Sequence, residues 1–332
     1  MRFFSKLLLL AGVVAVGFGA WIWNFSQSEL TIAEKPHTFV VKAGSNIRLV
    51  ARQLVDEHIL NEPWSFIVMA RLTGRASQLK AGNYLLDRDL TPYRLFEMLS
   101  NGDVTQIGVT FIEGWTFRQM RDELNRHEGI KHLGMAMTDS EILQRIGATE
   151  THPEGLFFPD TYYFASGMSD IDILKRAYQA MHDKFAQSWS TRAPGLPYTN
   201  PYQALIMASI VEKETGKSEE RPLIAGVFLN RLKLGMRLQT DPTVIYGLGE
   251  SYDGNIHKRD LLMDTPYNTY TRAGLPPTPI ANPGMGAIEA ALHPDQRNGY
   301  LYFVGKGDGS HVFSRNLTDH NRAVARYQLG KN

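Results

Sequence analysis

Hydrophobic residues follow one another without interruption near the beginning of the chain. The uncharged run covers residues 7–23 and comes directly after two cationic residues, Arg2 and Lys6. As a helix it would be roughly 26 Å long at about 1.5 Å per residue, close to the roughly 30 Å of a bilayer's hydrocarbon core. We therefore expect residues 1–25 to form a cytoplasmic tip and a transmembrane signal anchor. A cleaved signal peptide is the alternative, but bulky tryptophans follow the small residues and leave no clean cleavage site.

The charges around this run predict its orientation. Lys and Arg favour the cytoplasmic side of a membrane helix. The N-terminus is therefore expected in the cytoplasm and the remainder of the chain in the periplasm, with a single pass through the cell inner membrane. Residues 26–36 are mainly polar, and we expect them to form a short tether.

Alternating and helical spacings of apolar residues then predict a small β-α-α-β unit. The expected elements are a strand at 37–42 with an N-cap at Ser45, helices at 46–57 and 63–72, a strand at 80–86 and a further helix at 91–101. We assign residues 37–103 to this subdomain and its following helix. Residues 104–150 are expected to form a connecting strand-helix segment.

A faint internal repeat runs through this part of the chain. Residues 39–44 and the helix after them resemble residues 109–114 and the helix after those, at a constant offset of 70 residues. Each copy reads as a strand, a glycine turn and an amphipathic helix. Because any strand-turn-helix gives this pattern, a true structural repeat and a coincidence both remain open.

The pattern changes beyond residue 138 and predicts a larger domain. Helices are expected at 139–146, 170–185, 201–216 and 219–234, with a loop rich in proline and aromatic residues at 154–163 and a proline loop at 274–284. We assign residues 151–332 to a mixed α/β domain. The whole chain is therefore predicted to be an α+β protein with an N-terminal transmembrane helix.

Composition excludes several classes of function. The formal net charge is +1, from 35 Lys and Arg and 34 Asp and Glu, whereas nucleic-acid binding usually needs a basic excess, so no nucleic-acid partner is predicted. The absence of cysteine excludes disulfides, thiolate nucleophiles and Cys-type zinc sites. The sequence contains no H-E-x-x-H, G-x-S-x-G or phosphate-binding motif. The ten histidines are dispersed, and we expect His311 and His320 to be structural, so no metal site is predicted.

The helix predicted at 201–216 carries the strongest chemical signal. Residues 204–211 carry no charge and only one polar side chain, Ser209, as in a buried helix. Glu212 follows at the edge of this apolar stretch, where partial burial would raise its pKa toward that of a general acid. By spacing alone Glu214 is nearly as suitable, and a solvated helix end is the ordinary alternative.

Polar and aromatic residues after this helix suit a sugar, because aromatic faces stack on pyranose rings while amides and hydroxyls pair with sugar hydroxyls. A long structural loop is the alternative. The candidate substrate-binding residues are Ser209, Glu214, Gln239, Thr240, Asp241, Tyr246, Asn268, Tyr270, Pro276 and Asn282.

Five segments together resemble the YceG-like family of endolytic murein transglycosylases. They are A-S-I-V-E-K-E-T at 208–215, N-R-L at 230–232, L-Q-T-D-P-T-V-I-Y-G at 238–247, Y-N-T-Y at 267–270 and G-L-P-P at 274–277. The resemblance covers essentially the whole chain. It implies that the first glutamate of the V-E-K-E-T run, Glu212, is catalytic, and that residues 37–86 form a LysM-like subdomain that binds N-acetylglucosamine chains.

The resemblance also implies a reaction. Glu212 would protonate the oxygen between N-acetylmuramic acid and N-acetylglucosamine, and would then take the proton of the sugar's own C6 hydroxyl to close a 1,6-anhydro ring. No cofactor or metal is implied. The implied partners are nascent peptidoglycan glycan strands, whose length the enzyme would limit, the inner membrane and peptidoglycan synthases.

The residues alone also fit two other functions. One is a two-carboxylate glycoside hydrolase, with Asp241 or Glu214 as the second carboxylate. The other is a non-catalytic, membrane-tethered scaffold that binds peptidoglycan through residues 37–86.

Overall fold

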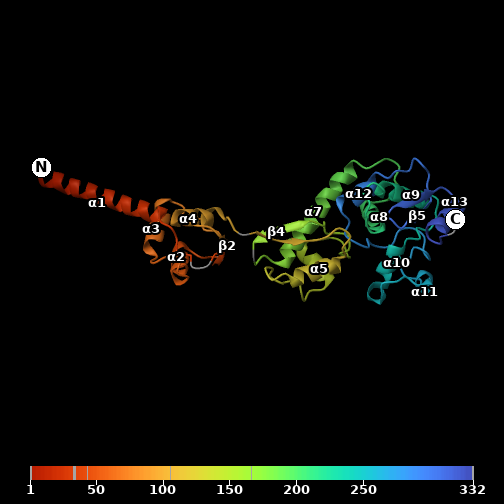
Figure 1. Cartoon of the computed structure of the whole chain (residues 1–332), viewed down its shortest axis with the longest axis horizontal. Coiled ribbons are helices and arrows are strands. Elements are labelled where there is room, and N and C mark those ends of the chain that lie inside the picture. Colours follow the sequence, from red (N-terminus) through yellow and green to blue (C-terminus); the bar gives the residue numbers. More distant parts are fainter. Residues whose placement is uncertain (1, 33–34, 43, 105, 166, 331–332) are drawn as a thin grey trace. The chain divides into compact units, whose positions relative to one another are not determined.

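A computed structural model describes residues 2–32, 35–42, 44–104, 106–165 and 167–330 (Figure 1). Contacts divide the chain into two compact units. The first comprises Met1–Ile107 and Tyr163–Gly167, and the second comprises Gly108–Tyr162 and Met168–Asn332. Most of the segment predicted as a connection, 104–150, therefore packs within the second unit.

The first unit contains the predicted β-α-α-β order. Its elements are α1 (Arg2–Gln27), β1 (His37–Val41), α2 (Ile47–Asp56), α3 (Trp64–Leu72), β2 (Gly82–Leu86) and α4 (Pro92–Asn101). Strands β1 and β2 are antiparallel, with His37 opposite Leu86. Their inward side chains Phe39 and Tyr84 are fully buried in one core with the apolar faces of α2, α3 and α4. Asn46, one residue after the predicted cap, accepts from two N–H groups at the start of α2.

Helix α1 confirms that an apolar helix begins the chain. Residues Leu8–Gln27 are long and apolar enough to cross a membrane, and α1 is the one such helix in the part of the chain that the structure describes. The segment after it is not a free tether in its described part. Leu30 is buried, and its N–H donates to the carbonyl of Leu90 at 2.9 Å, so the chain leaves α1 directly into the core of the first unit.

Strands β3 (Gln106–Thr110) and β4 (Thr161–Ala165) form a second two-stranded sheet. Two helices, α5 (Phe117–Arg126) and α6 (Asp139–Ile146), lie between them in the chain, which repeats the β-α-α-β order of β1 to β2. Gly44 and Gly114 have φ of +82° and +77°, a region open to glycine at little cost. The predicted order of strand, glycine turn and helix is confirmed in both copies.

The second unit is mainly helical. Its remaining elements are α7 (Asp170–Ser190), α8 (Pro201–Glu214), α9 (Arg221–Lys233), α10 (Asp241–Leu248), the 3-10 turn η1 (Gly249–Ser251), α11 (Lys258–Leu262), α12 (Met285–Leu292), β5 (Tyr302–Gly305), β6 (His311–Ser314) and α13 (Leu317–Tyr327). Helix α8 is buried from Ala204 to Val211, as its uncharged sequence predicts, and packs against α9 and α12. The hairpin β5–β6 and helices α10 to α13 were not predicted from the sequence.

Candidate active site

Glu212 lies in the last turn of α8 with its side chain only 6% exposed. Arg221, at the start of α9, donates from Nη2 to Oε1 at 3.2 Å, and the N–H of Gly284 donates to Oε2 at 3.0 Å. Burial raises the pKa of the Glu212 carboxyl, while the Gly284 N–H and the Arg221 charge act in the opposite direction. The raised pKa of Glu212 agrees with the expectation from the sequence.

The turn between β3 and α5 lies against the same carboxyl. Lys213 donates from Nζ to the carbonyl of Gly114 at 3.2 Å, and a Cβ on Gly114 would lie 3.6 Å from Cγ of Glu212. Glu113, which is half exposed, lies 3.9 Å from the guanidinium of Arg221. Its negative charge also raises the pKa of Glu212. Two carboxyl groups therefore share one arginine beside the end of α8.

Gly284 holds a tightly packed position in this cluster. A Cβ built on it would lie 1.9 Å from Oε1 of Glu113. Since real Cβ atoms essentially never approach that closely, only glycine fits beside this arrangement of Glu113. The backbone N–H of this residue is the one that donates to Glu212.

Asn282 connects three segments behind the Gly284 backbone. Its amide Nδ2 donates to the Trp115 carbonyl at 3.0 Å and to Oε1 of Glu154 at 3.3 Å, and its Oδ1 accepts from the N–H of Phe157 at 3.0 Å. The carbonyl of Asn282 accepts from the N–H of Gly114 at 2.9 Å. The residue is fully buried, so these bonds fix the 114–117 turn, the 154–157 loop and the proline loop relative to one another.

Glu154 is a third acidic group, and it is buried. Oε1 accepts from the N–H of Phe117 at 2.9 Å, and Oε2 accepts from the hydroxyl of Tyr246 at 3.1 Å. Burial nevertheless raises the pKa of Glu154 to about 7. The folded protein therefore holds a proton here in the range where an unfolded chain, with a pKa of about 4.3, has released it.

This shift predicts how stability depends on pH. Because the folded state binds the extra proton, the free energy of unfolding falls as pH rises from the unfolded to the folded pKa of Glu154. Wild type is expected to lose about 3 kcal/mol more than Glu154→Gln over this window, at about 1.4 kcal/mol per pH unit. Urea unfolding of both proteins at pH 5 and pH 8 measures the difference. Parallel pH dependences would contradict it, since Glu214 is present in both proteins.

Glu214 faces a different surface of the second unit. Residues two apart on a helix differ by about 200° around its axis, so Glu212 and Glu214 point to opposite sides. Glu214 accepts from the hydroxyl of Thr240, and burial raises its pKa to about 7. It lines a polar cavity of about 580 Å³ between the start of α10, the β5–β6 hairpin and α13.

This cavity brings together half of the predicted substrate-binding residues. They are Glu214, Gln239, Thr240, Asp241 and Tyr270, and the Tyr270 hydroxyl donates to Oδ1 of Asp241 at 2.6 Å. Gln239 has a φ of +52°, which is strained for a residue with a side chain. Arg231, which was not predicted as a site residue, donates to the carbonyls of Arg237 and Leu238, the two residues before Gln239. Its guanidinium lies over the Tyr302 ring.

Of the other five predicted binding residues, four are buried and Tyr246 is partly buried. The Ser209 hydroxyl donates to the Ile206 carbonyl at 2.7 Å and accepts from the N–H of Ile280 at 3.0 Å, so it attaches the proline loop to α8. The Asn268 amide donates to three carbonyls, at 2.7 to 3.2 Å. Asn282 is bonded as above, Tyr246 is bonded to Glu154, and Pro276 is buried. In this structure their polar groups bind the protein itself.

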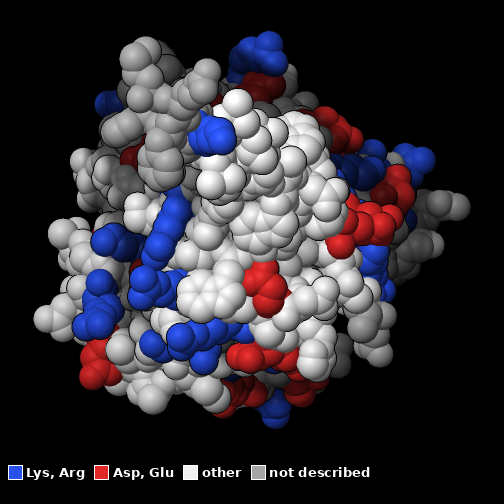
Figure 2. Space-filling view, turned by 90° about the vertical axis from the view of Figure 1, so that its left-hand side faces the viewer, with Lys and Arg blue, Asp and Glu red and all other residues white. Residues whose placement is uncertain are grey.

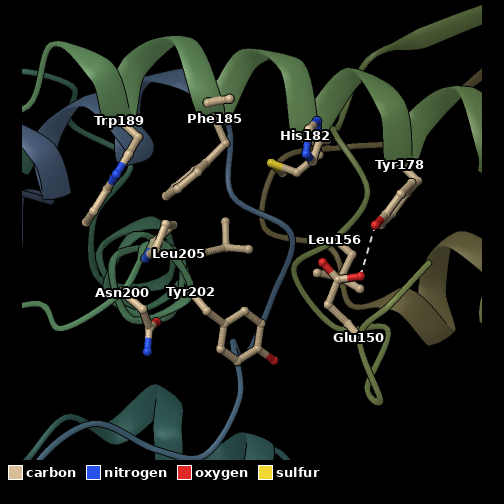
Figure 3. Close-up of a pocket in the computed structure, with 12 residues that line it drawn as sticks. Glu150, Leu156, Tyr178, His182, Phe185, Trp189, Asn200, Tyr202 and Leu205 are labelled. Carbon is tan, nitrogen blue, oxygen red and sulfur yellow. Dashed lines mark hydrogen bonds between the residues drawn. The ribbon is translucent and has the colours of Figure 1, made fainter.

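A second, more apolar cavity of about 460 Å³ lies at the other end of α8 (Figure 3). Side chains of α7 and of the first turns of α8 line it, together with Asn200 just before α8, and the Tyr178 hydroxyl donates to Glu150 at 2.9 Å. The labelled lining residues are Glu150, Leu156, Tyr178, His182, Phe185, Trp189, Asn200, Tyr202 and Leu205. None of the predicted site residues is among those that line this cavity.

Several members of the Glu212 cluster were missed in the sequence: Glu113, Glu154, Arg221 and Gly284. Glu113 and Gly114 belong to the second copy of the repeat, so the glycine turn was visible, but nothing connected it with Glu212. Gly284 is 72 residues from Glu212 in the chain. Contacts between residues so far apart in the chain leave no periodic pattern in a single sequence.

Comparisons with known proteins identify the family of the chain. The model of the YceG-like family matches residues 39–326. An endolytic murein transglycosylase of Bacillus subtilis (strain 168) is 31% identical over 95% of this chain and 91% of its own length. One from Streptococcus pneumoniae is 27% identical over 90% of this chain, which spans 60% of that relative. The crystal structure of a YceG-like protein from Listeria monocytogenes has a TM-score of 0.56 and 31% identity, covering 88% of this chain and 100% of that one. The chain belongs to the YceG-like family.

Proposed function

We propose that this protein is a membrane-anchored endolytic murein transglycosylase with Glu212 as its single acid/base. The observation that carries the proposal is the 31% identity to a protein of that name over 95% of this chain and 91% of the relative. The surroundings of Glu212 support the assignment, because they suit both states of a group that gives and then retakes a proton.

The two states have separate sources of stabilisation. Burial and the nearby Glu113 charge favour the protonated acid, which donates to the oxygen between N-acetylmuramic acid and N-acetylglucosamine. The Gly284 N–H and the Arg221 guanidinium favour the carboxylate that remains after donation. That carboxylate then accepts the proton of the C6 hydroxyl as this oxygen attacks C1, and the substrate's N-acetyl oxygen stabilises the developing cation.

This reaction needs one carboxyl group because the nucleophile belongs to the substrate. A two-carboxylate hydrolase places its two groups across the scissile bond, about 5 to 9.5 Å apart. Glu214 does not suit that role beside Glu212, since α8 separates the two side chains. Asp241 is hydrogen-bonded to Tyr270 at the Glu214 cavity.

We propose that the Glu214 cavity binds a sugar unit of the glycan. Its hydroxyl, amide and carboxyl groups can pair with sugar hydroxyls and an acetamido group, and Tyr270 offers an aromatic face. Ser209, Tyr246, Asn268, Pro276 and Asn282 would support binding through the loops that they hold.

We further propose that α1 spans the inner membrane, with its N-terminus in the cytoplasm and both units in the periplasm. The apolar length of α1 and the cations before it support this orientation. The β-α-α-β unit at 37–86 would act as a LysM-like glycan-binding module. Cleavage near peptidoglycan synthases would limit the length of nascent strands.

Product analysis tests the reaction. Uncrosslinked peptidoglycan glycan strands are incubated with the full chain in detergent, and the fragments are analysed by mass spectrometry. A transglycosylase gives 1,6-anhydromuramoyl ends, whereas hydrolysis adds one water and leaves a reducing end. Reducing ends would replace the proposal with a hydrolase. Sedimentation with sacculi without any released fragment would leave a binding scaffold.

A further inference from the structure

Helix α3 carries an apolar stripe that no other part of the described first unit covers. Trp64 and Leu72 are 70% and 64% exposed, and Val68 between them is partly exposed. These residues are four apart, so they lie on one face of the helix. The opposite face, which includes Phe66 and Ala70, is buried in the core of the unit. Large apolar side chains aligned in this way on a helix surface indicate a contact with an apolar phase or a partner.

The position of α3 favours the membrane over a protein partner as the surface that this stripe contacts. Helix α3 contacts α1, as does α4. Phe25, in the last turn of α1, packs against the core of the first unit, and Ile22 one turn earlier is already partly covered. Both residues belong to the apolar segment Leu8–Gln27. The first unit therefore begins within the end of the candidate membrane span, with no linker between them.

Membrane geometry then places α3 at the surface of the bilayer. If the end of α1 lies at the boundary between acyl chains and headgroups, elements packed on that end lie at the same depth. Tryptophan is enriched at this depth because its ring is amphipathic. Arg71, exposed in the last turn of α3, can reach lipid phosphates. Figure 2, seen from the side where α1 begins, shows a broad uncharged area beside Lys and Arg side chains. The apolar side chains of α1 are themselves exposed on the molecule, so the α3 stripe is identified by the exposure of its own residues.

We propose that the Trp64–Val68–Leu72 stripe of α3 lies in the headgroup region of the bilayer that α1 spans. This inference rests on the membrane anchoring in the proposed function. The contact adds a second, interfacial attachment to the transmembrane one, and it holds the glycan-binding unit against the membrane rather than at the end of a flexible stalk. Interfacial helices bind in this way through an apolar face that enters the headgroup boundary.

The absence of cysteine from the chain allows a direct test. Single cysteines are introduced into the full chain as Leu72→Cys on α3, Leu49→Cys on α2 and Val14→Cys on α1, and each is labelled with the fluorophore NBD. Leu49 is the matched control, since it is a leucine 52% exposed on another helix of the same unit. The proteins are reconstituted into vesicles of phosphatidylethanolamine and phosphatidylglycerol that contain doxyl-labelled lipid.

The expected result is a blue-shifted emission and loss of fluorescence to the lipid quencher at positions 14 and 72, with neither at position 49. Adding Trp64→Ser to the Leu72→Cys protein is expected to weaken the quenching at 72. If the label at position 14 is quenched and the label at position 72 is not, like that at position 49, α1 is anchored and the proposed α3 contact is wrong. If 14 is not quenched, the anchoring is wrong and the α3 contact with it. Protection of 72 from aqueous iodide without lipid quenching would show a protein partner and overturn the proposal.

Discussion

Glu212→Gln is expected to lower the release of anhydromuramoyl products by about two to four orders of magnitude, the usual contribution of a positioned general acid or base. Glutamine keeps the size of the side chain and one acceptor for the Gly284 N–H, but it cannot donate and retake the proton. The measurement is the initial rate of product formation, by chromatography, with circular dichroism to show that the variant is folded.

Two further variants test whether Glu212 or Glu214 is the proton donor. Glu219→Gln is the matched control, because Glu219 is an exposed glutamate just beyond α8, and it is expected to retain the wild-type rate. Glu214→Gln is the informative rival, since spacing in the sequence left it nearly as suitable as Glu212. If Glu214→Gln abolishes turnover and Glu212→Gln retains it, the proton donor is Glu214, and the Glu214 cavity holds the scissile bond.

Asn282→Ala is expected to lower the free energy of unfolding by about 2 kcal/mol, because a buried polar group left without a partner costs about 1 to 3 kcal/mol. The substitution leaves the Phe157 N–H without its acceptor. The Trp115 carbonyl keeps the backbone N–H of residue 282, and Glu154 keeps the Phe117 N–H and the Tyr246 hydroxyl. Urea unfolding monitored by tryptophan fluorescence measures the free energy of unfolding of both proteins.

Asn255→Ala provides the control, since Asn255 is exposed, and it is expected to change stability by less than about 0.5 kcal/mol. A free energy of unfolding for Asn282→Ala equal to that of this control would show that the network does not hold the loops together. Asn282→Ala is also expected to lower activity in conditions where it remains folded, because the Gly284 N–H moves with the loop.

Much of the local structure could be predicted from the sequence. Residues 204–211 have no charge and form a helix segment that is buried on all sides. The position of Glu212 at the edge of the core therefore follows from the order of apolar and charged residues. The β-α-α-β order was predictable because apolar spacing is regular at 37–86. Strands β5 and β6 have four residues each, which is too short to give a clear alternation.

The polar site residues were harder to interpret. Ser209, Asn268 and Asn282 have the side chains that bind sugars, yet here their hydrogen bonds go to the backbone and to Glu154. A single sequence does not distinguish an amide that holds a buried loop from one that faces a substrate, because both need the same donors and acceptors. Arg221 and Glu113 reach Glu212 only through tertiary contacts.

The close approach of Gly284 to Glu113 has a consequence for how this family can change. A methyl group at 284 would overlap the Glu113 carboxylate at 1.9 Å, so a side chain at this position requires the half-exposed Glu113 to take another rotamer. Relatives that carry a larger residue at the position of Gly284 should carry a shorter residue at that of Glu113 or hold the glutamate in another rotamer. In the laboratory, Gly284→Ala is expected to turn Glu113 away from Arg221, and in a Glu113→Ala protein the same substitution should have no such effect.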